Sequence, residues 1–137
     1  MKCHQRKIRD EMMASSPRPV QTSLDGCRVE EISRSEAESI ILVYEWLGTM
    51  PTAGQAFYGL KTPDNELIGV ACFGLGHGTK QRDICGVEYR EKAIGLERGA
   101  CVHWAHPHAP SFLVSKAVRQ AYLDYGWQIF YAYSDIE

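Results

Sequence analysis

Several features that identify particular protein classes are missing from this sequence. The cysteines include no CxxC pair and no two closer than 13 residues, which argues against a zinc knuckle or a thioredoxin-type site. No apolar run reaches the roughly 18 residues of a membrane span, and none follows the N-terminal charges as in a signal peptide. We therefore expect a soluble cytoplasmic protein with reduced thiols and no membrane partner. The five cysteines are Cys3, Cys27, Cys72, Cys85 and Cys101.

The chain also has little net charge. Fifteen Lys+Arg against 17 Asp+Glu leave −2 at pH 7, so a protein that coats nucleic acid by bulk electrostatics is not expected. Any DNA contact would use a local basic patch, and residues 1–22 carry +3 before ending in the SSPRP stretch. We interpret residues 1–22 as a basic arm, either solvated or contacting DNA or another partner. Residues 23–137, with 45% hydrophobic residues over the whole chain, are long enough for one folded domain.

The first part of that domain predicts a strand followed by a helix. Residues 28–32 (RVEEI) are the expected strand. Ser33 and Glu36 then form an S-x-x-E capping box, with a second possible frame two residues later. Apolar residues recur at helical spacing from there up to Gly48, a plausible end of the helix.

A hairpin and a long strand come next. Residues 57–60 and 67–74 are apolar and flank a Pro-Asp-Asn-Glu turn, which predicts an antiparallel hairpin. The glycine-rich segment 74–79 (GLGHGT) lacks the Lys-Ser/Thr ending of a phosphate-binding loop and predicts an ordinary loop. Residues 93–104 (AIGLERGACVHW) then predict a long strand.

The C-terminal part predicts a crossover between two parallel strands. The loop 103–110 leads to Ser111, a candidate cap for a helix over 111–124 that stops at Gly126. An aromatic strand over 128–134 follows, and a strand-helix-strand connection makes its two strands parallel. The expected fold class is α/β (α+β), a mixed sheet with helices on both faces.

Three features near this crossover, a helix start and two charged residues, suit an anion or an amine. The start of the helix is a ready anion site, although every crossover contains such a connection. Arg98 can hold a phosphate or carboxylate bidentately, or it forms a surface ion pair with Glu97 or Glu88. Asp135, at the end of a parallel strand, is either a general base for an amine or a turn residue.

Histidines form a second candidate site. His103, His106 and His108 make an H-x-x-H-x-H pattern, with His77 and a cysteine as extra metal ligands. This spacing matches no recognised metal motif, so a metal ion stays an alternative to solvated or loop-lining histidines. A Cys101–His103 nucleophile pair on one strand face is a further alternative.

The order of elements resembles the GNAT acyltransferase fold. In that family a Q/R-x-x-G-x-G/A loop opens the helix and grips the pyrophosphate of coenzyme A. The matching positions here are His106, Ala109 and Ser111, which lack the Arg/Gln and the glycines. The resemblance implies an acyl-CoA (acetyl-CoA) donor whose phosphate is held by the loop 105–111.

A closer resemblance, over about residues 28–137, is to the phage Mom group of GNAT-like proteins that modify adenine in DNA. It depends on the segments LERG, APSFLVS, YAYSD and WLGTMP. The match implies acyl or carbamoylmethyl-type transfer to adenine N6, for which iron and an acyl-CoA have both been considered. It implies that Arg98 and Ser115 (or Ser111) orient donor or base, while Asp135 takes the proton from the attacking amine.

One departure from the GNAT pattern leaves alternatives open. A complete GNAT fold continues beyond its fifth strand with another helix and two strands, whereas this sequence stops at Glu137. We therefore expect a sheet that lacks its last strands. A non-catalytic GNAT-like binding or structural module is the alternative to a DNA-modifying transferase, and a small histidine-cluster metalloprotein is the third interpretation.

Overall fold

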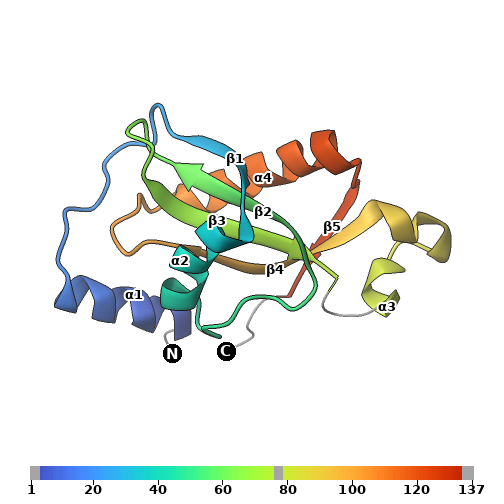
Figure 1. Ribbon diagram of the computed structural model, residues 1–137, viewed down its shortest axis with the longest axis horizontal. Helices are drawn as coiled ribbons and strands as arrows, with labels where there is room; N and C mark the ends of the chain where they lie inside the picture. The colour runs from blue at the N-terminus through green and yellow to red at the C-terminus, as the bar shows by residue number, and fades with distance from the viewer. Residues whose placement is uncertain (1–3, 76–78, 134–137) are drawn as a thin grey trace.

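A five-stranded mixed sheet forms the centre of the protein, seen in a computed structural model that describes residues 4–75 and 79–133 (Figure 1). The strands follow one another in space in chain order. The first four are antiparallel neighbours, and the last pairs in parallel with the fourth. The strands are β1 (Arg28–Ile32), β2 (Gly54–Lys61), β3 (Leu67–Gly74), β4 (Ala93–Cys101) and β5 (Ile129–Ala132). The α+β class and the parallel crossover are confirmed.

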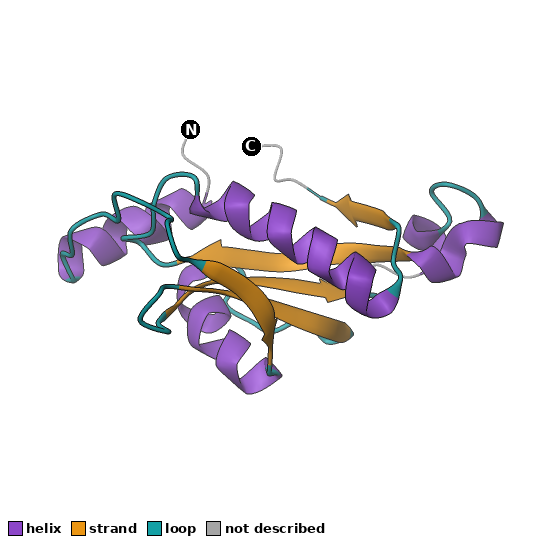
Figure 2. Cartoon of the chain, turned by 90° about the horizontal axis from the view of Figure 1, so that it is seen from above, coloured by secondary structure: helices purple, strands orange, loops and turns teal. Residues whose placement is uncertain are grey.

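Helices cover both faces of this sheet. Figure 2 shows α4 on one side of the strands and α2 on the other, and both helices contact β2, β3 and β4. The helices are α1 (His4–Ser15), α2 (Arg34–Tyr44), α3 (Thr79–Arg82), the 3-10 helix η1 (Val87–Lys92) and α4 (Ala109–Tyr125). None of the helices in the described ranges is long and apolar enough to span a bilayer.

The start of α2 is confirmed and its end is corrected. Ser33 Oγ accepts the Glu36 N–H at 3.1 Å, and the Glu36 carboxylate accepts the Ser33 N–H at 3.3 Å, so the capping box forms. The helix ends at Tyr44, before Gly48, because Glu45 is extended (φ −85°, ψ 136°). Gly48 has φ 63° in the following turn, a conformation that glycine adopts without strain.

The predicted hairpin is also confirmed. β2 and β3 pair in antiparallel register with Gly59 opposite Val70. Thr62 N donates to Glu66 O at 3.0 Å across the turn, and Asn65 takes a left-handed conformation (φ 70°). Asparagine tolerates that conformation better than most residues, so the turn chemistry fits its sequence.

The boundaries of the crossover differ from those predicted. β4 ends at Cys101; Val102 N still donates to Ile68 O of β3 at 2.9 Å, and His103 and Trp104 then form a turn that remains buried. Helix α4 begins at Ala109 with His108 as its N-cap, so the prediction that Ser111 caps it is wrong. Pro110 explains the earlier start, because its fixed φ and missing N–H suit a first turn. Gly126 ends the helix at φ 75°, as predicted.

The core lies between the sheet and helices α2 and α4. α4 turns alanines toward the strands, which lets the helix approach closely around Leu113 (2% exposed). Tyr58, fully buried in β2, donates its hydroxyl to Asp124 of α4 at 2.8 Å. The largest fully buried side chains include Tyr58, Phe73, Ile41, Leu60, Ile68, Ile94 and Leu113.

Residues 4–22, within the segment interpreted as a basic arm, form a helix and a stretch that lies against the domain. α1 ends at Ser15, just before the two prolines, and buries none of its residues. The following stretch is fixed to the loop after β4. Arg18 lies 3.6 Å from the centre of the Trp104 ring and pairs with Glu66, and Gln21 N donates to Trp104 O at 2.8 Å.

Candidate functional site

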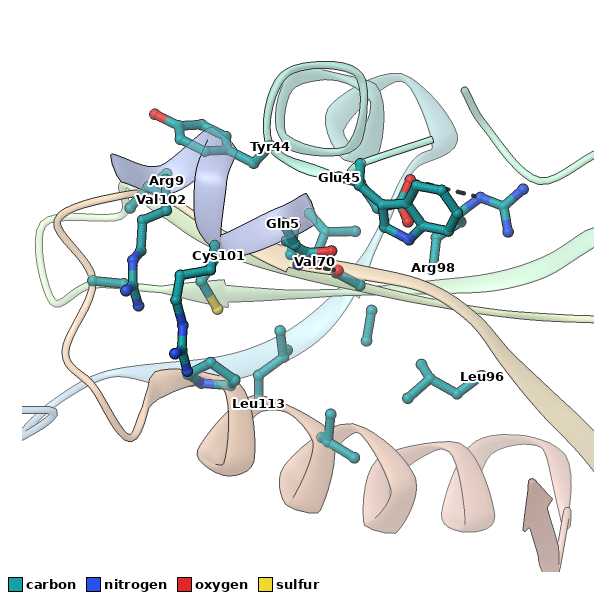
Figure 3. Close-up of a pocket in the computed structure, with 18 of the residues that line it drawn as sticks. Gln5, Arg9, Tyr44, Glu45, Val70, Leu96, Arg98, Cys101, Val102 and Leu113 are labelled. Carbon is teal, nitrogen blue, oxygen red and sulfur yellow. Dashed lines mark hydrogen bonds and ion pairs between the residues drawn. The ribbon is translucent and has the colours of Figure 1, made fainter. Parts of the chain in front are cut away.

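A cavity of about 730 Å³ lies beside the part of β4 that continues beyond its pairing with β5 (Figure 3). The two strands pair only as far as Leu96 and Ala132, while β4 continues to Cys101. Residues 97–101 therefore have β3 on one side and, among the described residues, no strand on the other. The cavity is lined by α1, the end of α2, β3, β4, the loop after it, the first turns of α4 and the end of β5.

Helix α1 lies beside this unpaired part of β4. The side-chain amide of Gln5 donates to Gly99 O at 2.9 Å, and the His4 ring stacks on Trp46 with centroids 5.5 Å apart. His4, Gln5, Arg6 and Arg9 all line the cavity. α1 thus reaches the edge of β4 through Gln5 and forms one side of the cavity.

A buried ion pair lies at one end of the cavity. Arg98 Nε is 3.9 Å from Glu45 Oε2, and the side chains are 19% and 5% exposed. Burial raises the pKa of Glu45, while the hydrogen bond from Leu47 N (2.8 Å) and the charge of Arg98 lower it. Arg98 also donates from Nη1 to Glu97 O at 2.9 Å. The ion pair that this residue forms is thus with a buried acid, Glu45.

Arg98 retains unused hydrogen-bonding capacity at the cavity. Its Nε is buried and has no hydrogen-bond partner, because 3.9 Å is too long for such a bond. A buried guanidinium nitrogen without an acceptor is costly. An acceptor atom of a ligand in the cavity would satisfy it.

His103 has a structural position behind the cavity. Its Nε2 lies 2.8 Å from Ser16 O and its Nδ1 lies 2.9 Å from the hydroxyl of Tyr44. A carbonyl only accepts, so Nε2 carries the proton and Nδ1 accepts from Tyr44. Burial raises the pKa of Tyr44, which keeps this hydroxyl protonated. The ring thus connects α2, the loop after β4 and the stretch after α1.

The loop before α4 was expected to cradle phosphate with its backbone. In the structure His106 N donates to Gln21 Oε1 at 3.1 Å and His108 N donates to His106 Nδ1 at 3.0 Å. Ala109 N donates to His106 O at 2.8 Å, and Pro110 has no N–H. These backbone donors are therefore engaged within the protein.

The predicted site residues are only partly brought together. Arg98 and His106 both line the cavity. Ala109 is fully buried, and Ser111 is exposed with its hydroxyl donating to His108 O at 3.1 Å. Ser115 is exposed on α4 and is not among the cavity residues. Asp135, the predicted general base, lies outside the described residues.

The histidine pattern does not converge on one point. The rings of His106 and His108 are 5.3 Å apart, whereas His103 faces Tyr44 and Ser16. In the described part of the chain, no three His, Cys, Asp or Glu side chains are placed to hold a metal ion, and His77 lies outside it. Metal binding stays a prediction.

The proposed thiol nucleophile is disfavoured by its surroundings. Burial raises the pKa of Cys101 to about 12, so the thiol is protonated near neutral pH and is a weak nucleophile. Both ring nitrogens of His103, its candidate base, already face other partners.

Sequence reasoning missed the residues that α1 and α2 bring to the cavity. Gln5, Arg6 and Arg9 were grouped with the arm, because a short basic segment carries no signal of where it packs. Tyr44 and Glu45 were considered only as the end of a helix. A single acid inside the apolar run IILVYEWL was the available signal for Glu45.

Comparison with known proteins adds no relative. No family model matches the chain, and no curated protein matches it. The resemblance to the GNAT fold and to the Mom group remains a prediction from the sequence.

Proposed function

We propose that this protein is a transferase that holds an acyl-CoA donor in the cavity beside β4 and passes an acyl-type group to an amine. Adenine N6 in DNA is the acceptor that the resemblance to the Mom group implies. The observation that supports this most is the cavity of about 730 Å³ beside residues 97–101 of β4, which on that side pair with no strand among the described residues. A cavity of that volume suits a small-molecule ligand, and the amides of a pantetheine arm can hydrogen-bond to an open strand edge.

The polar groups around the cavity suit this chemistry. In acyl transfer the amine nitrogen attacks the thioester carbonyl carbon, the C–N bond forms, and the C–S bond breaks with the thiolate leaving. The amine must lose a proton, which a nearby carboxylate can take and the thiolate finally receives. Glu45 is such a carboxylate, because burial raises its pKa. Arg98 lines the cavity, and its positive charge can stabilise the carbonyl oxygen as it gains charge.

Two further elements belong to this proposal. The segment 1–22 carries a local charge of +3 that can approach a DNA backbone. A cytoplasmic location supplies acyl-CoA and keeps the cysteines reduced. Asp135 remains the alternative proton acceptor that the Mom resemblance implies.

Calorimetric titration of the full chain with acetyl-CoA tests the donor half of the proposal. We expect one donor bound per chain, and no binding at millimolar acetyl-CoA contradicts it. Mass spectrometry of adenine nucleosides from DNA of expressing cells tests the acceptor half. We expect a mass increase equal to the transferred group, and unmodified adenine contradicts it.

A non-catalytic binding module is the second candidate. The engaged backbone donors of His106, His108 and Ala109 favour it, because they leave the loop with few groups to hold a donor's phosphate. Arg98→Ala and Asp135→Ala separate the two candidates. Loss of adenine modification in variants that still fold supports the enzyme. A phenotype of expressing cells that persists in both variants without any adenine modification supports the binding module.

A further inference from the structure

We propose that Arg6 and Arg9 of α1, rather than the loop before α4, bind the phosphate groups of the ligand in this cavity. The inference rests on the proposed function and names the residues that recognise the anionic part of the donor. Neither arginine was among the residues that the sequence singled out as a site.

The first argument is that the backbone N–H groups of the loop before α4 already form hydrogen bonds within the protein. The N–H groups of His106, His108 and Ala109 bond to acceptors within the protein, at 2.8–3.1 Å. Pro110 contributes no N–H to the first turn of α4. A helix start that binds phosphate does so with free backbone N–H groups. At this one, none of the five residues from 106 to 110 offers a free N–H, because three are hydrogen-bonded within the protein and two are prolines.

The second argument is that α1 carries guanidinium groups to the same cavity. Arg6 and Arg9 both line it, and three residues apart on a helix they share a face. The nearest acid to Arg9 is its chain neighbour Asp10, 3.7 Å away, with side chains 54% and 42% exposed. An exposed pair of that length is weak, so Arg9 can exchange it for a phosphate.

The charges of the cavity are divided between its ends. Glu45 is already paired with Arg98, and Figure 3 shows these two side chains at the opposite end from Arg9. The α1 side therefore has cationic groups that the buried acid does not neutralise. Guanidinium groups bind phosphate bidentately, so two on one helix face suit a pyrophosphate or a nucleotide phosphate.

The third argument concerns why α1 lies where it does. The helix buries no residue fully: Met13 packs against the edge of the core, and its first turn is held by contacts of Gln5 with Gly99 and His4 with Trp46. A helix of this length has little stability of its own in water. A role in ligand contact explains its position better than a role in the core.

The test compares Arg6→Gln, Arg9→Gln and the double variant with Lys7→Gln. Lys7 is on the same helix but is exposed and is not a cavity residue, so it is a matched control for charge. Gln has nearly the helix propensity of Arg and Lys, so α1 should stay helical, which circular dichroism checks. The probe is coenzyme A, titrated into the full-length chain by calorimetry at low salt.

We expect each arginine variant to bind coenzyme A about tenfold more weakly and the double variant about 100-fold more weakly, as for lost charge-assisted hydrogen bonds. Lys7→Gln should stay within about twofold of the wild type, because Lys7 does not line the cavity and its charge is screened from a ligand there. Affinity of the wild type should fall with added salt, and that of the double variant should fall less.

The outcomes separate this inference from the proposed function. If the wild type binds coenzyme A and the double variant binds as well as Lys7→Gln, the inference is overturned while the proposed function stands. If the wild type does not bind, the proposed function fails first. If the double variant loses affinity for DNA but keeps it for coenzyme A, the arginines belong to a nucleic-acid contact, which also overturns the inference.

Discussion

The cavity has two facing sides of unlike construction, α4 and α1. α4 buries Ala109, Leu113, Ala117 and Ala121 against the sheet and contacts four of its strands. α1 has no fully buried residue, packs only Met13 against the core, and reaches β4 through one side-chain amide. The packing of the core therefore fixes the position of α4. The position of α1 depends on fewer contacts, so ligand binding can adjust it. A site of this kind combines a fixed surface that aligns the ligand with an adjustable one that supplies charge.

The largest expected difference between the two sides is in stability. Leu113→Ala should lower the free energy of unfolding by about 2–5 kcal/mol, because it empties a buried position. Ile8→Ala, the same kind of truncation in α1 at a partly exposed position, should cost less than about 1 kcal/mol. Chemical denaturation of both variants measures the contrast, and equal losses would show that α1 is part of the core.

The buried ion pair at the fixed end should give the next largest effect. Arg98→Gln leaves Glu45 buried without its positive partner, and we expect a loss of about 1–3 kcal/mol in stability. In the Arg98→Gln/Glu45→Gln double variant much of that loss should disappear, because the uncompensated charge is gone. Strictly additive losses in this cycle would mean that the two side chains do not interact.

A smaller effect is the pH dependence that Glu45 brings to stability. Its pKa is raised in the folded state, so the folded protein binds the proton more tightly than the unfolded one. The ionised group therefore lowers stability above the folded pKa, and this penalty disappears as pH falls toward the ordinary carboxyl range. The wild type should gain stability relative to Glu45→Gln over that window, as measured by thermal unfolding at several pH values. A constant difference would contradict the raised pKa.

The smallest effect concerns the stretch that carries α1. Arg18→Ala removes both the contact with the Trp104 ring and the pair with Glu66. Because Arg18 is exposed, the melting temperature should hardly change, but amide exchange over residues 16–21 should become faster. Lys116→Ala, which removes the looser contact of Lys116 with Phe112 (5.7 Å), is the control and should leave that exchange unchanged. Unaltered exchange in Arg18→Ala would show that other contacts hold this stretch.

Local patterns predicted most of the elements. The capping box at Ser33 and Glu36 and the helix end at Gly126 each depend only on residues close together in the chain. Both form as predicted. The predicted cap at Ser111 was wrong because Pro110 favours a helix start about one turn earlier. The sequence holds two neighbouring start signals, Pro110 and Ser111, and the proline prevails. α1 was not predicted as a helix, because its apolar residues are too few to show a buried face.

The composition of the site was harder to predict than the fold. Arg98 could be chosen because a guanidinium near the crossover suits an anion, and His106 because it matches a position of the GNAT loop; both line the cavity. Glu45 and Arg9 come from elements far away in sequence, and only packing brings them to β4. The hydrophobic periodicity of a sequence predicts local elements, and it does not predict which distant elements pack together.

Hydrogen–deuterium exchange of the full chain with and without coenzyme A tests the central claim most directly, that one ligand binds between α1 and the open part of β4. We predict slower exchange on binding in both residues 4–15 and residues 96–101. Unchanged exchange in both ranges at a saturating concentration of coenzyme A would contradict the claim.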